Sequence, residues 1–167
     1  FEDIDRVLEV NFWGVVAMTK AFLPELLKRP KASIVNVSSM GGFIPVPGQT
    51  LYGASKAAVK MFTEGLHAEL RGTNVAVTVV FPGAVRTGIS ANSGVAIPGR
   101  TAEQAEQSGQ KLTSPEEAAA LIIRGMRRGA YRVALGRDAQ MLDLFTRLAP
   151  ERAMALISDR MGSLLDR

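Results

Sequence analysis

The chain opens with a long stretch in which apolar residues recur every three or four positions. Between residues 3 and 28 these positions form a wide stripe on one side of a helix, with Asp3 as a candidate N-cap and Pro30 just past the end. A short β-branched run over 33–38, followed by two glycines, is typical of a buried strand that leads into a loop. The start of the chain therefore predicts a helix and then a strand.

The alternation of helical and strand patterns continues to the end of the chain. We expect a helix over 53–70, a strand over 74–81, a helix over 114–128, a strand over 131–135, and then two helices divided by Pro150. Residues 88–112 hold few large apolar groups, which favours a loop or lid. Strands separated by helices predict an α/β fold with a doubly wound parallel sheet.

Composition narrows the class of protein. The 167 residues are 47% hydrophobic, which suits one domain with a sizeable core. The net charge of +4 suggests an anionic partner, but the basic residues are scattered, and the nearest cluster, around Arg124 and Arg128, ends a predicted helix. We therefore expect no nucleic-acid partner.

Three absences bear on the compartment and the chemistry. The chain has no cysteine, which excludes disulfides, thiolate zinc sites and cysteine nucleophiles and fits a cytoplasmic protein. No apolar run approaches the roughly 18 residues of a membrane span. No cluster of histidines and carboxylates indicates a metal site.

The most informative pair of residues is Tyr52 and Lys56. Their spacing of four places both side chains on one face of a helix, about one turn apart. A cation beside a phenol stabilises the phenolate, so the pair is a candidate proton-transfer device for alcohol and carbonyl chemistry. Taken alone, the same spacing also describes an ordinary surface pair on a helix.

Three other segments accompany this pair in a recognisable order. They are Asn11-x-x-Gly14 in the first helix, Asn36-Val37-Ser38-Ser39 at the end of the first strand, and Pro82-Gly83 with Thr87 after the second strand. Together with Tyr52-Gly53-Ala54-Ser55-Lys56 they resemble the short-chain dehydrogenase/reductase family, from about residue 1 to about residue 136. This resemblance implies a Rossmann-like sheet and an NAD(P)-dependent oxidoreductase that acts on a secondary alcohol or ketone.

The resemblance also implies a role for each catalytic residue. Tyr52 would be the general acid or base, and Lys56 would stabilise its phenolate and bind the nicotinamide ribose. Ser39 would donate a hydrogen bond to the substrate oxygen, with Ser38 as the rival position and strand-end capping as the alternative role. Asn11 would distort its helix and hold a water that connects to Lys56; the alternative is a surface asparagine.

The cofactor implied by the family is NAD or NADP, which the sequence does not distinguish. Tyr52 and Lys56 would contact the nicotinamide riboside. Pro82 and Gly83 would let the backbone approach the nicotinamide ring, while the Val85 amide and the Thr87 hydroxyl would hold the carboxamide.

The Gly-rich turn with which this family holds the pyrophosphate does not occur in the sequence. We therefore expect residues 1–136 to be the C-terminal, catalytic half of a Rossmann domain, residues 137–167 to be a helical extension, and roughly 100 residues to be missing. The 167 residues alone are then expected to be inactive. The alternative is a non-catalytic fragment that serves as a binding or dimerisation module.

Two surfaces follow from the same reading. Apolar residues between the serine and the tyrosine are candidates for either substrate pocket or core: Met40, Phe43, Ile44 and Val46, with Gln49 and Ile89. By family resemblance, helices 3–28 and 53–70 would pair with their copies in a homodimer or homotetramer. Candidate interface residues are Val7, Phe12, Met61, Phe62 and Leu66. We also expect strand 33–38 to need a neighbour on its second edge.

Overall fold

The structure is a computed structural model that describes residues 1–87 and 112–161. Its elements, in chain order, are α1 (Glu2–Leu8), the π-helical turn η1 (Glu9–Trp13), α2 (Gly14–Leu27), β1 (Ala32–Val37), the 3₁₀ helix η2 (Met40–Gly42), α3 (Thr50–Glu69), β2 (Val75–Pro82), α6 (Pro115–Arg127), β3 (Arg132–Leu135), α7 (Arg137–Leu148) and α8 (Pro150–Met161). The expected loop over 88–112 lies almost entirely outside the described residues.

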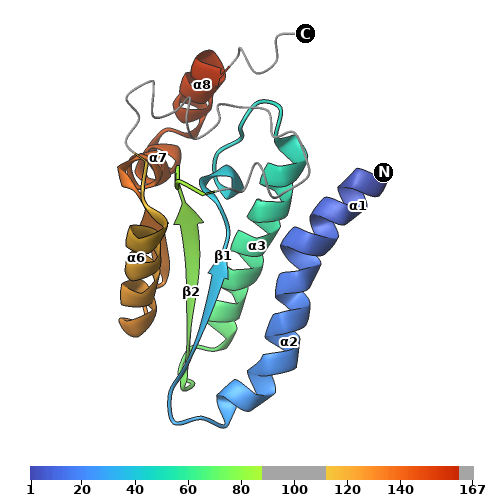
Figure 1. Cartoon of the computed structure of the whole chain (residues 1–167), viewed down its shortest axis with the longest axis vertical. Helices are drawn as coiled ribbons and strands as arrows, with labels where there is room; N and C mark the ends of the chain where they lie inside the picture. The colour runs from blue at the N-terminus through green and yellow to red at the C-terminus, as the bar shows by residue number, and fades with distance from the viewer. Residues whose placement is uncertain (88–111, 162–167) are drawn as a thin grey trace.

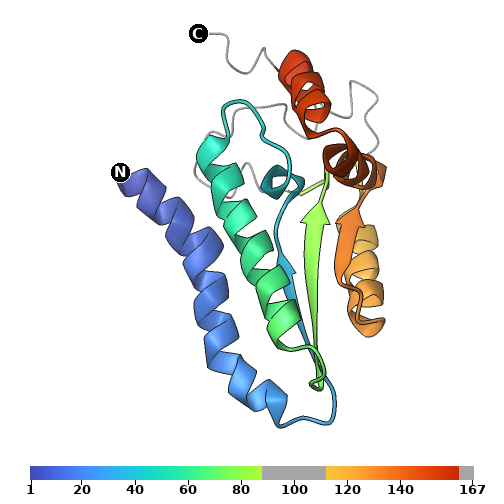
Figure 2. The same cartoon turned by 180° about the vertical axis from the view of Figure 1, so that it is seen from behind.

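The described strands form one parallel sheet in the order β1-β2-β3. Figures 1 and 2 show α3 and the α1–α2 helix on one face of this sheet and α6 on the other. Helices on both faces of a parallel sheet are the doubly wound α/β arrangement that the alternating pattern predicts, and that prediction is confirmed.

Each face of the sheet has its own core. On the α3 face, strand residues pack against Leu66, with Leu23, Leu26, Phe62 and Leu70 around them; the strand residues are Ala32, Ile34, Val75 and Val77. On the α6 face, Val80 and Leu135 pack against Ala118. Leu66 is therefore core, and its expected place on a surface left free for a second subunit is wrong, because this side of α3 lies against the sheet.

β2 and β1 differ in how deeply they are buried. Residues 77–81 of β2 are buried on both faces, as expected of a central strand. β1 alternates between buried and less buried residues and ends at Val37, which is 43% exposed. Within the described residues, β1 pairs with β2 alone, so its need for a second neighbour stays a prediction.

Most predicted elements are confirmed, with shifts at their ends. Ser114 caps α6, because its side chain accepts a hydrogen bond from the Glu117 amide, and Pro115 occupies the first turn as predicted. The helix expected from residue 53 begins at Thr50, which places Tyr52 inside its first turn. Asp3 is not the N-cap, because that position is Phe1; Asp3 lies in the first turn, where its charge complements the helix dipole.

The helix expected over 3–28 is interrupted by η1, a turn in which the Gly14 amide bonds to the Glu9 carbonyl, five residues back. Such wide turns insert one extra residue and often occur at functional sites. Here the extra residue lies around Asn11, the position at which the family resemblance implies a distorted helix. The periodicity of apolar residues did not predict this turn.

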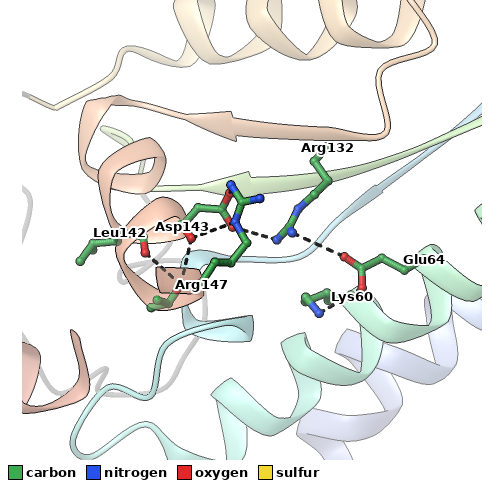
Figure 3. Close-up of polar contacts among 7 residues, drawn as sticks. Lys60, Glu64, Arg132, Leu142, Asp143 and Arg147 are labelled. Carbon is green, nitrogen blue, oxygen red and sulfur yellow. Dashed lines mark hydrogen bonds and ion pairs between the residues drawn. The ribbon is translucent and has the colours of Figure 1, made fainter. Parts of the chain in front are cut away.

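A network of ion pairs joins α3, β3 and α7 (Figure 3). The Arg132 guanidinium lies 2.9 Å from one Asp143 oxygen and 4.0 Å from Glu64. Arg147 binds the other Asp143 oxygen at 3.0 Å, and Lys60 binds Glu64 at 3.0 Å. The guanidinium also lies 4.8 Å from the centroid of the Phe81 ring in β2. The charged groups thus connect α3 and α7 to strand β3 of the sheet.

Across residues 1–87 and 112–161, none of the helices has both the length and the apolar character that crossing a membrane requires.

Candidate functional site

The residues expected at the site come from the carboxyl ends of neighbouring strands. Ser39 follows β1, and Pro82 ends β2, which runs parallel to β1. α3 starts near the same end of the sheet, so Tyr52 and Lys56 in its first turns lie there too (Figure 1). The carboxyl edge of a doubly wound sheet is where ligands bind in this class of fold.

The loop after β1 is held tightly against α3. The Ser38 hydroxyl, which is 2% exposed, donates a 2.7 Å hydrogen bond to the Lys56 carbonyl. A Cβ at Gly42 would lie 2.6 Å from the Ser38 oxygen and 2.8 Å from the Lys56 carbonyl oxygen, so only glycine fits there. Ser38 therefore has a structural partner, which favours Ser39 as the residue that faces a ligand.

Ser39 and the Tyr52 ring both lie next to Gly41. Its side chain caps η2 by accepting a hydrogen bond from the Gly41 amide at 3.1 Å, the capping role weighed from the sequence. A Cβ built on Gly41 would lie 3.6 Å from the Ser39 hydroxyl and 3.5 Å from Tyr52 Cε1. The hydroxyl that accepts from Gly41 keeps its own proton to donate, so capping and substrate binding are compatible.

Tyr52 and Lys56 lie on one face of α3. The Lys56 Nζ is 5.9 Å from the centroid of the Tyr52 ring and makes one long bond, 3.4 Å, to the Val37 carbonyl. Burial removes water from the ammonium group and lowers the pKa of Lys56 below 10.5. Both side chains are half-buried. Within the described residues, the Tyr52 hydroxyl makes no hydrogen bond, so it remains able to give or take a proton.

Asn11 reaches α3 from the π-helical turn. Its side-chain amide donates a 3.0 Å hydrogen bond to the Ser55 hydroxyl, which donates in turn to the Tyr52 carbonyl at 2.7 Å. Asn11 is half-buried, unlike the surface asparagine considered as its alternative role. The polar partner of the Asn11 side chain is Ser55, whereas the Lys56 ammonium donates to the Val37 carbonyl.

The turn that follows β2 is bound on two sides. The Gly83 amide donates to the Leu135 carbonyl at 2.9 Å, and the Ala84 carbonyl accepts from the Thr113 amide at 3.0 Å. The Ala84 amide donates to Asp138 at 2.9 Å. A Cβ at Gly83 would overlap the Asp138 carboxylate, so this glycine is needed for contact with a side chain of the protein itself.

Val85 and Thr87 complete this turn. Val85 forms an isolated parallel bridge with Thr113, and its own amide makes no hydrogen bond within the described residues. Thr87 is exposed. Both groups are therefore free to bind a ligand.

Sequence reasoning missed three residues of this region: Gly42, Ser55 and Asp138. Ser55 stands inside the motif that contains Tyr52 and Lys56, but its partner Asn11 is 44 residues away. Asp138 binds Ala84, which is 54 residues away. No local pattern could have predicted these contacts, because they depend on how the elements pack.

Of the apolar candidates between Ser39 and Tyr52, Ile44 is core, and Met40, Phe43 and Val46 are half-buried. Ile44 is 2% exposed, and the Phe43 ring packs against Phe81 with a centroid separation of 5.2 Å. Both also line an open pocket of about 380 Å³ between this loop and the last helices, with Pro45, Thr146, Pro150, Glu151 and Met154. Ile89 lies outside the described residues.

The chemistry of these groups fits a nicotinamide riboside. The Lys56 ammonium lies near the Tyr52 ring, and the turn after β2 carries an exposed hydroxyl at Thr87 and a Val85 amide that has no partner in residues 1–87 and 112–161. Hydroxyls of a ribose and a carboxamide need donors and acceptors of this kind.

Comparison with known proteins agrees with this geometry. Residues 1–98 match the model of a family described as short chain dehydrogenase. A protein of Mycobacterium tuberculosis (strain ATCC 25618 / H37Rv) that carries the name "Putative oxidoreductase SadH" is 40% identical to this chain over 162 residues, which is 95% of this chain and 59% of that protein.

Two solved structures show the same fold. A short chain dehydrogenase from Burkholderia cenocepacia J2315, in complex with NADP, is 28% identical with a TM-score of 0.73; the match covers 90% of this chain and 56% of that one. A short-chain dehydrogenase from Sphingobium yanoikuyae, in complex with NADPH, is 25% identical with a TM-score of 0.68, over 99% of this chain and 57% of that one. The chain thus spans 56% to 59% of the length of these three proteins.

Proposed function

Since the chain belongs to the short-chain dehydrogenase/reductase family of oxidoreductases, we propose that it carries the catalytic half of an NAD(P)-dependent enzyme that interconverts a secondary alcohol and a ketone. The observation that carries this proposal is the grouping of Tyr52, Lys56 and Ser39 at the carboxyl edge of the sheet. When bound, the nicotinamide would supply or accept the hydride.

Tyr52 would give a proton to the ketone oxygen in reduction and take one from the alcohol in oxidation. Lys56 supports this role because its ammonium lies near the phenol ring, 5.9 Å from the centroid, and its single long bond leaves N–H groups for the ribose hydroxyls. Ser39, which like the Tyr52 ring lies next to Gly41, would donate to the same substrate oxygen and stabilise the negative charge that develops there.

Asn11 would act on Tyr52 through Ser55. The two hydrogen bonds from Asn11 to Ser55 and from Ser55 to the Tyr52 carbonyl support a role in fixing the start of α3. The proton relay through a water between Asn11 and Lys56 remains part of the proposal. Pro82, Gly83, the Val85 amide and the Thr87 hydroxyl would hold the nicotinamide.

The whole protein would also supply the phosphate-binding turn, and residues 137–167 would form a helical extension of the catalytic half. A homodimer or homotetramer through α1–α2 and α3 is supported by apolar side chains on these helices that are more than half exposed: Val10, Trp13, Met18, Phe22 and Met61.

The test uses reduced cofactor that is deuterated at the transferable position, with acetophenone and cyclohexanone as probe ketones. The whole protein should produce alcohols with deuterium on the carbinol carbon, detected by mass spectrometry. The 167 residues alone should bind the cofactor weakly in a fluorescence titration, because the sequence lacks the Gly-rich turn. A whole protein that binds cofactor yet transfers deuterium to neither ketone would favour the non-catalytic alternative.

A further inference from the structure

Asp138 connects the start of α7 to the turn that follows β2. It is the second residue of α7, and its Oδ2 accepts a hydrogen bond from the Ala84 amide at 2.9 Å. The two residues are 54 positions apart. No part of the proposed reaction assigns a role to this half-buried carboxylate.

The packing around Asp138 leaves its carboxylate little freedom. A Cβ built on Gly83 or on Gly136 would overlap a carboxylate oxygen, so the group lies directly against the backbones of two glycines. Gly136 also has a φ of +90°, a conformation that other residues rarely adopt. Both glycines are therefore required for the carboxylate to reach the Ala84 amide.

Ala84 stands between Gly83 and Val85, the residues proposed to contact the nicotinamide. The Thr113 amide holds the Ala84 carbonyl, and Asp138 holds the Ala84 amide. Each peptide unit is planar and trans, so fixing the Ala84 carbonyl also fixes the direction of the Val85 N–H. The two contacts thus orient both peptide planes that flank Ala84.

From this geometry we infer that Asp138 is a positioning residue for the cofactor, which holds the Ala84 amide so that the backbone of Gly83 and Val85 presents one fixed surface to the nicotinamide. The inference rests on the proposed function, since it assigns a support to the cofactor site of that reaction. The competing role is purely structural: an acid in the first turn of α7 stabilises that helix through its dipole.

The experiment compares Asp138→Ala with Asp138→Asn in the whole protein, with Asp159→Ala on α8 as the exposed control. An asparagine oxygen still accepts the Ala84 N–H, whereas alanine does not. NADPH affinity, measured by fluorescence titration, should fall about tenfold in Asp138→Ala, the effect of losing one charge-assisted hydrogen bond. It should fall only about twofold in Asp138→Asn and remain unchanged in the control.

A second readout needs no cofactor. Hydrogen exchange at the Ala84 amide, followed by NMR, should be faster in Asp138→Ala and close to normal in Asp138→Asn, while the amides of β2 stay protected. Normal exchange and normal NADPH affinity in Asp138→Ala would overturn the inference. Equal losses in both variants would also overturn it, because they would assign the effect to charge at the helix terminus. If the unmodified protein binds neither NADPH nor NADH, the proposed function fails, and Ala84 exchange still tests the contact.

Discussion

The two halves of α3 hold their polar side chains in opposite ways. In the first turns, Lys56 makes one long hydrogen bond and Tyr52 makes none through its hydroxyl within the described residues. Two turns further on, Glu64 is bound by Lys60 and lies 4.0 Å from Arg132, which in turn binds Asp143. The first half of α3 therefore carries a pair, Tyr52 and Lys56, that can still form hydrogen bonds to a ligand. The second half carries Glu64, whose charge is largely neutralised by its basic neighbours.

The difference separates chemistry from stability. A partly buried charge without a close partner costs free energy, and such sites persist where the group has a task to perform. A partly buried charge that is paired and hydrogen-bonded joins elements and leaves little capacity for a ligand. Mutations in the first half of α3 should thus change rates, and mutations in the network should change stability.

The largest expected effect is on turnover in Tyr52→Phe. Without the phenol hydroxyl the proton has no donor, so kcat should fall by about 10²- to 10⁴-fold. Cofactor affinity should stay nearly normal, since the ring and Lys56 remain. Steady-state rates and a cofactor titration on the whole protein measure both quantities.

The matched control is Tyr131→Phe, which removes the other tyrosine hydroxyl of the chain from a partly exposed ring that lies beside His67, with Glu64 near the hydroxyl. Its kcat should stay within about twofold of normal, because Tyr131 precedes the amino end of β3, at the opposite end of the sheet from the proposed site. If Tyr52→Phe lost cofactor affinity and turnover to the same extent, Tyr52 would have a structural role. The proposed difference between the two halves of α3 would then be wrong.

The second effect is on stability in Arg132→Met. This change leaves Asp143 with Arg147 alone and removes a cation from the Phe81 ring. Because the pair is partly exposed, we expect a loss of about 2 kcal/mol in the free energy of unfolding, below the cost of breaking a fully buried pair. Urea denaturation measures it, and the exposed Arg152→Met on α8 serves as the control.

The activity of folded Arg132→Met protein sharpens the same comparison. Rates per folded molecule should remain within about twofold of normal, since none of the network residues is among those proposed to contact substrate or cofactor. A large fall in kcat with unchanged stability would show that the network takes part in the chemistry.

The smallest effect is a pH dependence from Lys56. An ammonium is charged below its pKa, and burial lowers the pKa of Lys56 below 10.5, so the charge is lost at lower pH than in an ordinary lysine. In a Tyr52→Phe background, which removes the phenol, cofactor affinity should weaken as the pH rises towards 10.5. Titrations of cofactor across this alkaline range measure the effect.

The control is the double variant Tyr52→Phe with Lys56→Met, whose cofactor affinity should be lower and independent of pH in the same range. If cofactor affinity in the double variant depended on pH as it does in Tyr52→Phe alone, another group would be responsible for the titration. That result would contradict the proposed role of Lys56 in binding the ribose.

The sequence predicts whether a segment forms a helix or a strand, because that choice depends largely on residues close together along the chain. Apolar periodicity predicted the helices and strands, and the Ser114–Pro115 start of α6 was read from its capping chemistry. The apolar periodicity did not predict the π-helical turn η1, because periodicity describes only a regular helix. The contact made at this turn, between Asn11 and Ser55, joins two different helices.

The same distinction holds for the candidate site. Tyr52 and Lys56 are one helical turn apart, so their spacing alone predicted that they share a face. The sequence also indicated Ser39 and the turn after Pro82 as strand ends. It offered no means to pair Ser38 with the Lys56 carbonyl, or Asp138 with the Ala84 amide, across 18 and 54 residues.

Local spacing by itself thus determined which side chains are available for proton transfer and which segments form the sheet and its helices, because those properties depend on backbone periods. Tertiary structure alone decided which of these groups are left unpaired. Packing puts Leu66 in the core and pairs Arg132 with Asp143, whereas the Tyr52 hydroxyl has no hydrogen-bond partner among the residues that the structure describes. Hydrogen-bond partners and burial depend on distances between elements, which no local pattern encodes.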